Sequence, residues 1–124
     1  MQYWHEVKSF KQDQFDVIVD WTYETVPVRE MFDETVSDIE DMERRCNAGL
    51  DTHYIARVRF MYDGVEMGCS TLGSCYAYDC EPEDDINTGV SGYLEDMIEE
   101  AESEARDRAV EMIDRLKRDF LEIG

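Results

Sequence analysis

The residues of this sequence best suited to chemistry are carboxylates crowded into one segment, residues 79–104. This segment holds eleven acidic residues and no lysine or arginine. Residues 60–105 as a whole carry 13 acids and no base, which is a net −13 out of −19 for the chain. Uncompensated negative charge attracts cationic surfaces, so the pattern predicts a binding site for a basic partner. The expected binding residues are Asp79, Glu81, Glu83, Asp84, Asp85, Glu95, Asp96, Glu99, Glu100, Glu102 and Glu104.

Cysteine and histidine offer a second kind of chemistry, but their spacing does not match known sites. Cys69, Cys75 and Cys80 are spaced C-x5-C-x4-C, whereas zinc sites typically use C-x2–4-C with a paired second half. His53 or Cys46 would complete four ligands, and His53 beside a cysteine would make a nucleophilic pair, so both alternatives stay open. We expect reduced thiols and no metal or cofactor.

Recognisable motifs of catalysis and metal binding are missing from the sequence. It contains no P-loop, GxGxxG, GxSxG or HExxH pattern. The stretch DCEPEDD resembles the start of an EF-hand loop, but Asp84 stands where that loop needs glycine and Val90 where it needs glutamate. We therefore expect a protein that is not an enzyme, with only loose divalent-cation binding left open.

Length and charge limit the class of protein further. A chain of 124 residues fits one domain, expected to span residues 1–124. A net charge of −19 argues against direct binding to nucleic acid or to anionic membranes. The N-terminus shows no basic stretch followed by an apolar one, and no apolar run approaches the ~18 residues that span a bilayer, so we expect a cytoplasmic location.

The first half of the chain predicts two strands and a helix. Residues 3–10 alternate weakly, and residues 15–24 alternate clearly, with Phe15, Val17, Val19, Trp21 and Tyr23 on one face and Asp16, Asp20, Thr22 and Glu24 on the other. Residues 11–14 would join the two strands. Apolar residues then step by three or four up to residue 46. A capping box of Ser37 with Glu40, or of Thr35 with Asp38, would start this helix, and Gly49 would end it.

The second half predicts a hairpin and a long helix. Alternation returns in residues 53–62, and Asp63 with Gly64 forms a strong hairpin-turn signal. The returning strand would place Val65, Met67, Cys69 and Thr71 on one face, and Gly68 and Gly73 suggest a bulge or an early end. Residues 73–90 are expected to be a loop. From about residue 91 a helix of about 45 Å follows, with an inner stripe of Leu94, Ile98, Ala101, Ala105, Ala109, Met112, Leu116 and Phe120.

These elements predict an α+β fold in the order ββαββα. The simplest architecture is an antiparallel sheet of about four strands with two helices packed on one face, the second of them the long acidic helix. The helix places the carboxylates in two rows, Glu95, Glu99 and Glu102 in one and Asp96, Glu100 and Glu104 in the next. Charges one turn apart lie about 5.4 Å apart along the axis, whereas a DNA strand carries one per about 3.4 Å. The rows therefore resemble a sparser version of a nucleic-acid backbone.

Small size and carboxylate-lined helices are shared with a known class of proteins. On residues 79–104, the chain resembles the small acidic anti-defence proteins of phages, the DNA-mimic anti-CRISPR and anti-restriction inhibitors. The hairpin RVRFMYDGVEMG before an acidic helix is similar to small phage proteins as well. The resemblance implies a stoichiometric inhibitor that occludes the nucleic-acid-binding surface of a basic protein or ribonucleoprotein of a host defence system, in the host cytoplasm.

Other functions remain open on the sequence. A solvated acidic helix needs no partner, and nine arginines against three lysines, together with many aspartates, fit a salt-adapted protein. A phage accessory or assembly protein would instead form homo-oligomers through its sheet, and 14 aromatic residues leave a homodimer open. Tyr76, Tyr78 and Tyr93 flank the acidic segment, where they would either join an interface or cap the core.

Overall fold

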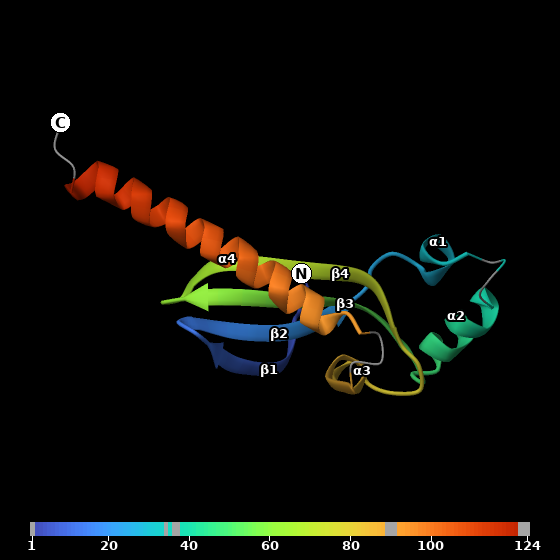
Figure 1. Cartoon of the computed structure of the whole chain (residues 1–124). Coiled ribbons are helices and arrows are strands. Elements are labelled where there is room, and N and C mark those ends of the chain that lie inside the picture. The colour runs from blue at the N-terminus through green and yellow to red at the C-terminus, as the bar shows by residue number, and fades with distance from the viewer. Residues whose placement is uncertain (1, 34, 36–37, 89–91, 122–124) are drawn as a thin grey trace.

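Four antiparallel strands form the sheet of this protein, in the order β1-β2-β3-β4 (Figure 1). The structure is a computed structural model, and it describes residues 2–33, 35, 38–88 and 92–121. The strands are β1, His5–Gln12; β2, Phe15–Tyr23; β3, Thr52–Tyr62; and β4, Val65–Ala77. With the helices that follow, this arrangement confirms the predicted α+β class.

Both hairpin turns are two residues long. Asp63 and Gly64 have φ of 50° and 79°, the left-handed conformations of a type I′ turn, so this predicted turn is confirmed. The first hairpin is tighter than expected. Lys11 pairs with Asp16 and Gln12 with Phe15, so only residues 13 and 14 make the turn. Asp13 in this turn has a φ of 54°.

Strand β4 is irregular at both of its glycines. Met61 pairs with Glu66 but Phe60 pairs with Gly68, so Met67 is the extra residue of a bulge. The bulge reverses the alternation after it: Met67 and Ser70 are buried, whereas Cys69 and Thr71 lie opposite the two arginines of β3 on the other face. The predicted shared face of Val65, Met67, Cys69 and Thr71 is therefore wrong beyond Met67. A second register shift follows near Gly73, and β4 then continues to Ala77, where a loop was expected.

Two short helices lie between β2 and β3, beyond one end of the sheet and not on its face (Figure 1). They are α1, Val28–Met31, and α2, Ile39–Asn47. The expected box of Thr35 with Asp38 is not the cap seen, because Asp38 is itself the cap and accepts a hydrogen bond from the Asp41 backbone N–H at 3.0 Å. The expected box of Ser37 with Glu40 cannot be compared, since Ser37 lies outside the described residues. The predicted stop at Gly49 is confirmed, with φ of 77° and the paired backbone bonds of a Schellman motif.

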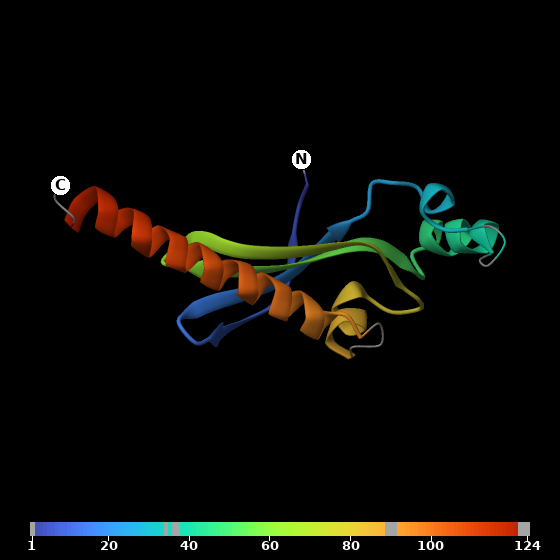
Figure 2. The same ribbon diagram turned by 45° about the horizontal axis from the view of Figure 1, so that its top comes forward.

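The C-terminal helices follow β4. Helix α3, Pro82–Thr88, falls inside the expected loop, and α4, Leu94–Leu116, crosses the sheet on β4 and β3 before a π-helical turn, η1, Lys117–Leu121. Figure 2 shows the C-terminal half of α4 running past the sheet. Ala101 and Ala105 of the expected stripe are buried, but Met112, Leu116 and Phe120 are exposed because no sheet lies beneath them.

The core lies between the sheet and α4. It joins the side chains of β2 and β3 to Met97, Ala101 and Ala105 of α4 and Ile86 of α3. Phe15, Val17, Val19 and Trp21 are all buried as predicted, whereas Tyr23 is exposed. This packing fixes α4 against the sheet and presents its opposite side to solvent.

The other face of the sheet is partly covered, which the alternation did not reveal. Asp20 is buried there, between Arg57, which it contacts at 2.7 Å, and Arg59, at 3.3 Å. The Trp4 ring covers the Arg57 guanidinium at 3.7 Å, and Thr22 is buried while donating to the Tyr3 carbonyl. The N-terminal segment thus shields an ion cluster on this face.

Candidate functional site: the acidic face of α4

The N-terminal half of α4 presents unpaired carboxylates to solvent. Within the described ranges, no ion pair or side-chain hydrogen bond engages the exposed side chains of Glu95, Asp96, Glu99, Glu100 and Glu104. The helix is held from beneath by Met97, Ala101 and Ala105, so these acids occupy its outer side. We call these five residues the acidic face. It retains most of the predicted helical rows.

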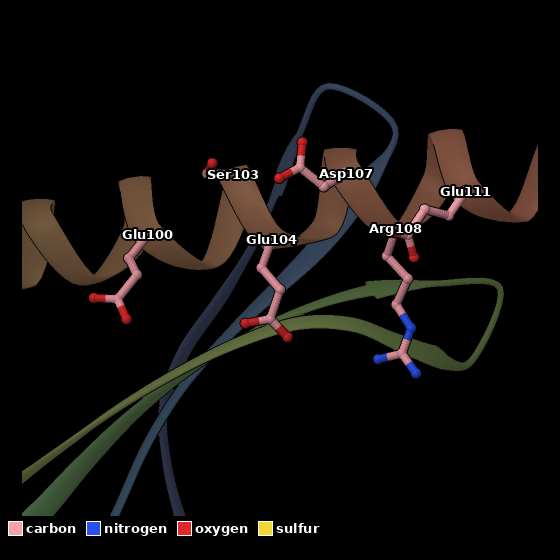
Figure 3. Close-up of a pocket in the computed structure, with 6 residues that line it drawn as sticks. All are labelled: Glu100, Ser103, Glu104, Asp107, Arg108 and Glu111. Carbon is pink, nitrogen blue, oxygen red and sulfur yellow. The ribbon is translucent and has the colours of Figure 1, made fainter.

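One predicted row continues beyond its expected end. A shallow hollow on the outer side of α4 is lined by Glu100, Glu104, Asp107 and Glu111, together with Ser103 and Arg108. Figure 3 shows Glu100, Glu104 and Arg108 pointing the same way from successive turns. Several acids and arginines of α4 are spaced i, i+4, and in the described part of the helix one such ion pair is present, Glu102–Arg106, at 3.5 Å. Negative charge therefore extends past Glu104 to Asp107 and Glu111, with the Arg108 cation between these acids.

Glu102 leaves its predicted row. It is only partly exposed, accepts a hydrogen bond from the Gln12 amide at 2.9 Å and lies close to Arg106. Arg106 also pairs with Asp13 in the β1–β2 turn. Glu102 thus ties α4 to the first hairpin and belongs to the fold and not to the acidic face.

Two acids of α3 are structural as well. Asp85 is buried and accepts a hydrogen bond from the Tyr54 hydroxyl at 2.5 Å, and the Tyr54 and Tyr93 hydroxyls lie 2.6 Å apart. Glu83 accepts a hydrogen bond from the Trp21 indole N–H at 2.8 Å. The expectation that Asp85 contacts a partner directly is therefore wrong, because its side chain is buried. Contact by the partly exposed Glu83 stays a prediction, and both acids anchor α3 to the sheet. Sequence could not show this, since every acid in a turn looks solvated.

The remaining predicted acids, Asp79, Glu81 and Asp84, are exposed near the start of α3. The Asp79 carboxylate lies 3.7 Å from Arg45, and its backbone N–H donates to Asp51 at 2.8 Å. Figure 1 places α3 beside the N-terminal end of α4. These three carboxylates therefore add negative charge next to the acidic face, with Asp79 partly neutralised.

Arginines of α2 and β3 are engaged by acids away from the acidic face. Arg45 makes two bonds to the buried Asp51, at 2.9 and 3.0 Å, and Arg57 and Arg59 surround Asp20. Arg44 pairs with Asp41 on α2 itself. Because these cations are already engaged, the fold leaves the acidic face uncompensated.

Asp51, Arg45 and the partly buried Tyr76 form a polar network at the α2 end of the sheet. Burial raises the pKa of Asp51, but hydrogen bonds from Arg45 and Tyr76 outweigh it and hold that pKa below its ordinary value. Burial, and then the bond to Asp51, raises the pKa of Tyr76. Tyr76 and Tyr93 thus serve the fold, whereas Tyr78 is exposed, with Arg45 4.3 Å from its ring centre.

All four cysteines are free, and across the residues that the structure describes no three His, Cys, Asp or Glu side chains cluster so as to hold a metal ion. Burial raises the pKa of Cys75, which disfavours its thiolate, and burial lowers the pKa of His53. Cys69 lies on the opposite side of the sheet from Cys75.

Comparison of the chain with protein-family models, with curated proteins and with solved structures found no match. In the described part of the chain, no helix has the length and apolar character needed to cross a membrane. The case for function therefore rests on the chemistry of the surface.

Proposed function

We propose that this protein is a stoichiometric inhibitor that docks the acidic face of α4 on the nucleic-acid-binding surface of a basic partner. The observation that carries the proposal is the row of exposed, unpaired carboxylates on a helix whose other side is fixed in the core. The proposed partner is a basic protein or ribonucleoprotein of a host defence system, of the anti-CRISPR or anti-restriction kind. Inhibition would act by occlusion, without catalysis.

Electrostatics support this kind of recognition. Acids within the first turn complement the helix dipole, but the effect fades after about one turn, so it accounts for Glu95 and Asp96 only. Glu99, Glu100 and Glu104 lie beyond that turn, and in the described part of the chain none of the three takes part in an ion pair or a side-chain hydrogen bond. A partner that normally neutralises phosphates with lysine and arginine would be steered to them and would release their counterions.

The proposed contact set is narrower than the acidic segment. It comprises the acidic face, extended by Asp107 and Glu111 on α4 and by Glu81 and Asp84 beside it. Asp85, Glu83 and Glu102 act indirectly, because they hold α3 and α4 in place. Substitution of any of these three residues would disturb the fold, so the binding test must leave them intact.

The test uses a triple charge reversal, Asp96→Lys, Glu100→Lys and Glu104→Lys. Immobilised wild-type protein is incubated with host lysate at about 100 mM salt, where the Debye length is about 10 Å. Proteins retained are eluted with duplex DNA, and separately with high salt, and identified by mass spectrometry. We expect a nucleic-acid-binding protein that both treatments release and that the triple variant does not retain.

The matched control reverses three exposed acids elsewhere, Glu6→Lys, Glu30→Lys and Glu66→Lys, and gives the same net charge. This control should retain the partner. Equal retention by wild type and by the α4 variant, or retention that duplex DNA and salt do not disturb, would overturn the proposal.

The alternative function is assembly through the sheet, without inhibition. Strands β1 and β4 form the two edges, and such edges can pair with another strand. A homodimer joined through β1 and insensitive to every change on α4 would favour this alternative.

A further inference from the structure

The C-terminal half of α4 exposes apolar side chains that a helix in water would normally bury. Ile113 is 52% exposed, Leu116 51% and Phe120 77%. Val110, Met112 and Leu121 are exposed beside them. A contiguous apolar strip of this kind marks an interaction surface and not the scatter found on any protein.

This strip forms one wall of an apolar groove. Its floor and other wall come from Phe15, Met67 and Tyr62, near the ends of the two hairpins. The ion pair of Arg106 with Asp13 closes the end nearest the core. Apart from Asp13, Gln14 and Arg106, the side chains that line the groove are apolar or aromatic.

The distribution of charge along the chain indicates which partner would fit the groove. Residues 106–121 carry four acids and five bases, whereas residues 60–105 carry 13 acids and no base. Two copies of a chain with net charge −19 repel each other strongly, except where their overhanging segments meet. An antiparallel pairing of these segments would also hold the two acidic halves at opposite ends of the assembly.

The flanking charges are self-complementary in that arrangement. Arg108 and Asp119 lie eleven residues apart, which is about three helical turns, so they share one flank of the apolar strip. About a twofold axis between Ile113 and Asp114, Arg108 of each copy faces Asp119 of the other. Within the described ranges, both side chains are exposed and neither takes part in an ion pair. An isologous interface would supply two equivalent pairs.

We infer that a second copy of this chain occupies the groove, with the two overhanging segments of α4 packed antiparallel and Phe120 of each near the groove of the other. This interface does not use the acidic face, so the inference stands independently of the proposed function.

Sedimentation velocity over about 1 to 500 µM tests the pairing. Wild type is expected to pass from monomer to dimer within this range. Ile113→Glu places a charge in the groove and should weaken the dimer by at least about tenfold. Ser103→Glu, an exposed position on the outer side of α4, adds the same charge and should leave the dimer unchanged.

A charge swap tests the register. Arg108→Asp alone and Asp119→Arg alone each create repulsion across the axis and should weaken the dimer, whereas the double variant restores both pairs and should recover it. Far-UV circular dichroism and thermal melting verify that each variant is folded. A wild type that stays monomeric at the highest concentration, or a dimer indifferent to Ile113→Glu, overturns the inference. Failure of the double variant to rescue overturns the antiparallel register.

Discussion

The absence of a side chain at Gly68 allows α4 to pack closely against the sheet. It lies at the β4 bulge, directly beneath α4, where Ala101 and Ala105 are fully buried. A Cβ added at Gly68 would collide with the Ala101 carbonyl oxygen and lie 2.8 Å from the Ala105 backbone nitrogen. Both obstacles are backbone atoms of a helix, so they cannot rotate away. The close approach of α4 to the sheet therefore requires glycine here.

We predict that Gly68→Ala lowers the free energy of unfolding by about 2–3 kcal/mol, because α4 must shift and its contacts with the core loosen. Urea unfolding followed by circular dichroism measures this loss. Gly73→Ala is the control, since its Cβ would meet only the end of the flexible Glu24 side chain, at 3.2 Å. A cost at Gly68 no larger than at Gly73 would contradict the proposed packing.

At single positions, sequence predicts burial well only where hydrophobicity and periodicity agree. Val17 and Val19 were assigned to the core correctly. Asp20 was placed on the strand face opposite the core and Asp85 among the partner-binding acids, yet both are buried. Their burial depends on partners distant in sequence, Arg57 for one and Tyr54 for the other. Such pairings arise from the tertiary fold, so no local sequence pattern predicts them.

Elements followed the same rule, with bulges as the main source of error. The strands and the long helix were predicted because their periods persist over many residues. One extra residue at Met67 was enough to invert the face assignment of Cys69 and Thr71. Helix α3 was not predicted, because its seven residues make barely two helical turns, which is too short for a periodic pattern to be recognised. The overhang of α4 was missed because a periodic stripe predicts an apolar face, and only the length of the sheet decides what covers it.

Helix α2 is attached to the sheet by a network of hydrogen bonds centred on Asp51. Asp51, just before β3, accepts two bonds from Arg45 of α2, one from Tyr76 of β4 at 2.5 Å and one from the Asp79 N–H. Few apolar side chains of α2 are buried, Ile39 being fully so. The attachment of this helix therefore depends heavily on a single carboxylate.

We predict that Asp51→Asn destabilises the protein by about 2 kcal/mol at neutral pH, because charge-assisted bonds become neutral ones. The folded pKa of Asp51 lies below its unfolded value of about 3.9, so its contribution is complete above that pH and is lost as pH falls through the folded pKa. Urea unfolding at several pH values should show the difference between wild type and variant constant down to about pH 5 and shrinking below about pH 3.9.

Glu40→Gln removes one exposed charge of α2 without altering the hydrogen bonds to Asp51, so its effect on the free energy of unfolding should be small. A difference between wild type and Asp51→Asn that persists unchanged at the lowest pH would show that the carboxylate acts by shape and not by charge.

Over the whole molecule, charge is segregated along α4. The acidic face lies over the core, the C-terminal half with balanced charge extends past the sheet, and Arg57 and Arg59 of the sheet share the buried Asp20. A salt-adapted protein would instead spread its acids evenly and would unfold in low salt, recovering in molar potassium chloride. Segregation suits a molecule that meets one partner at one end and a second copy at the other.

The carboxylates of the acidic face should therefore lower the stability of the folded protein, because like charges lie one turn apart on the helix. Glu100 lies one turn from both Asp96 and Glu104, so Glu100→Lys converts two repulsive spacings into attractive ones. We predict a gain of about 0.5–1 kcal/mol in the free energy of unfolding at about 10 mM salt, which diminishes as screening increases. Urea unfolding across a salt series measures it, and Glu6→Lys, on β1, corrects for the change in net charge. If Glu100→Lys gave no more than this control, the carboxylates would not repel one another, and the acidic face would be neutralised within the chain itself.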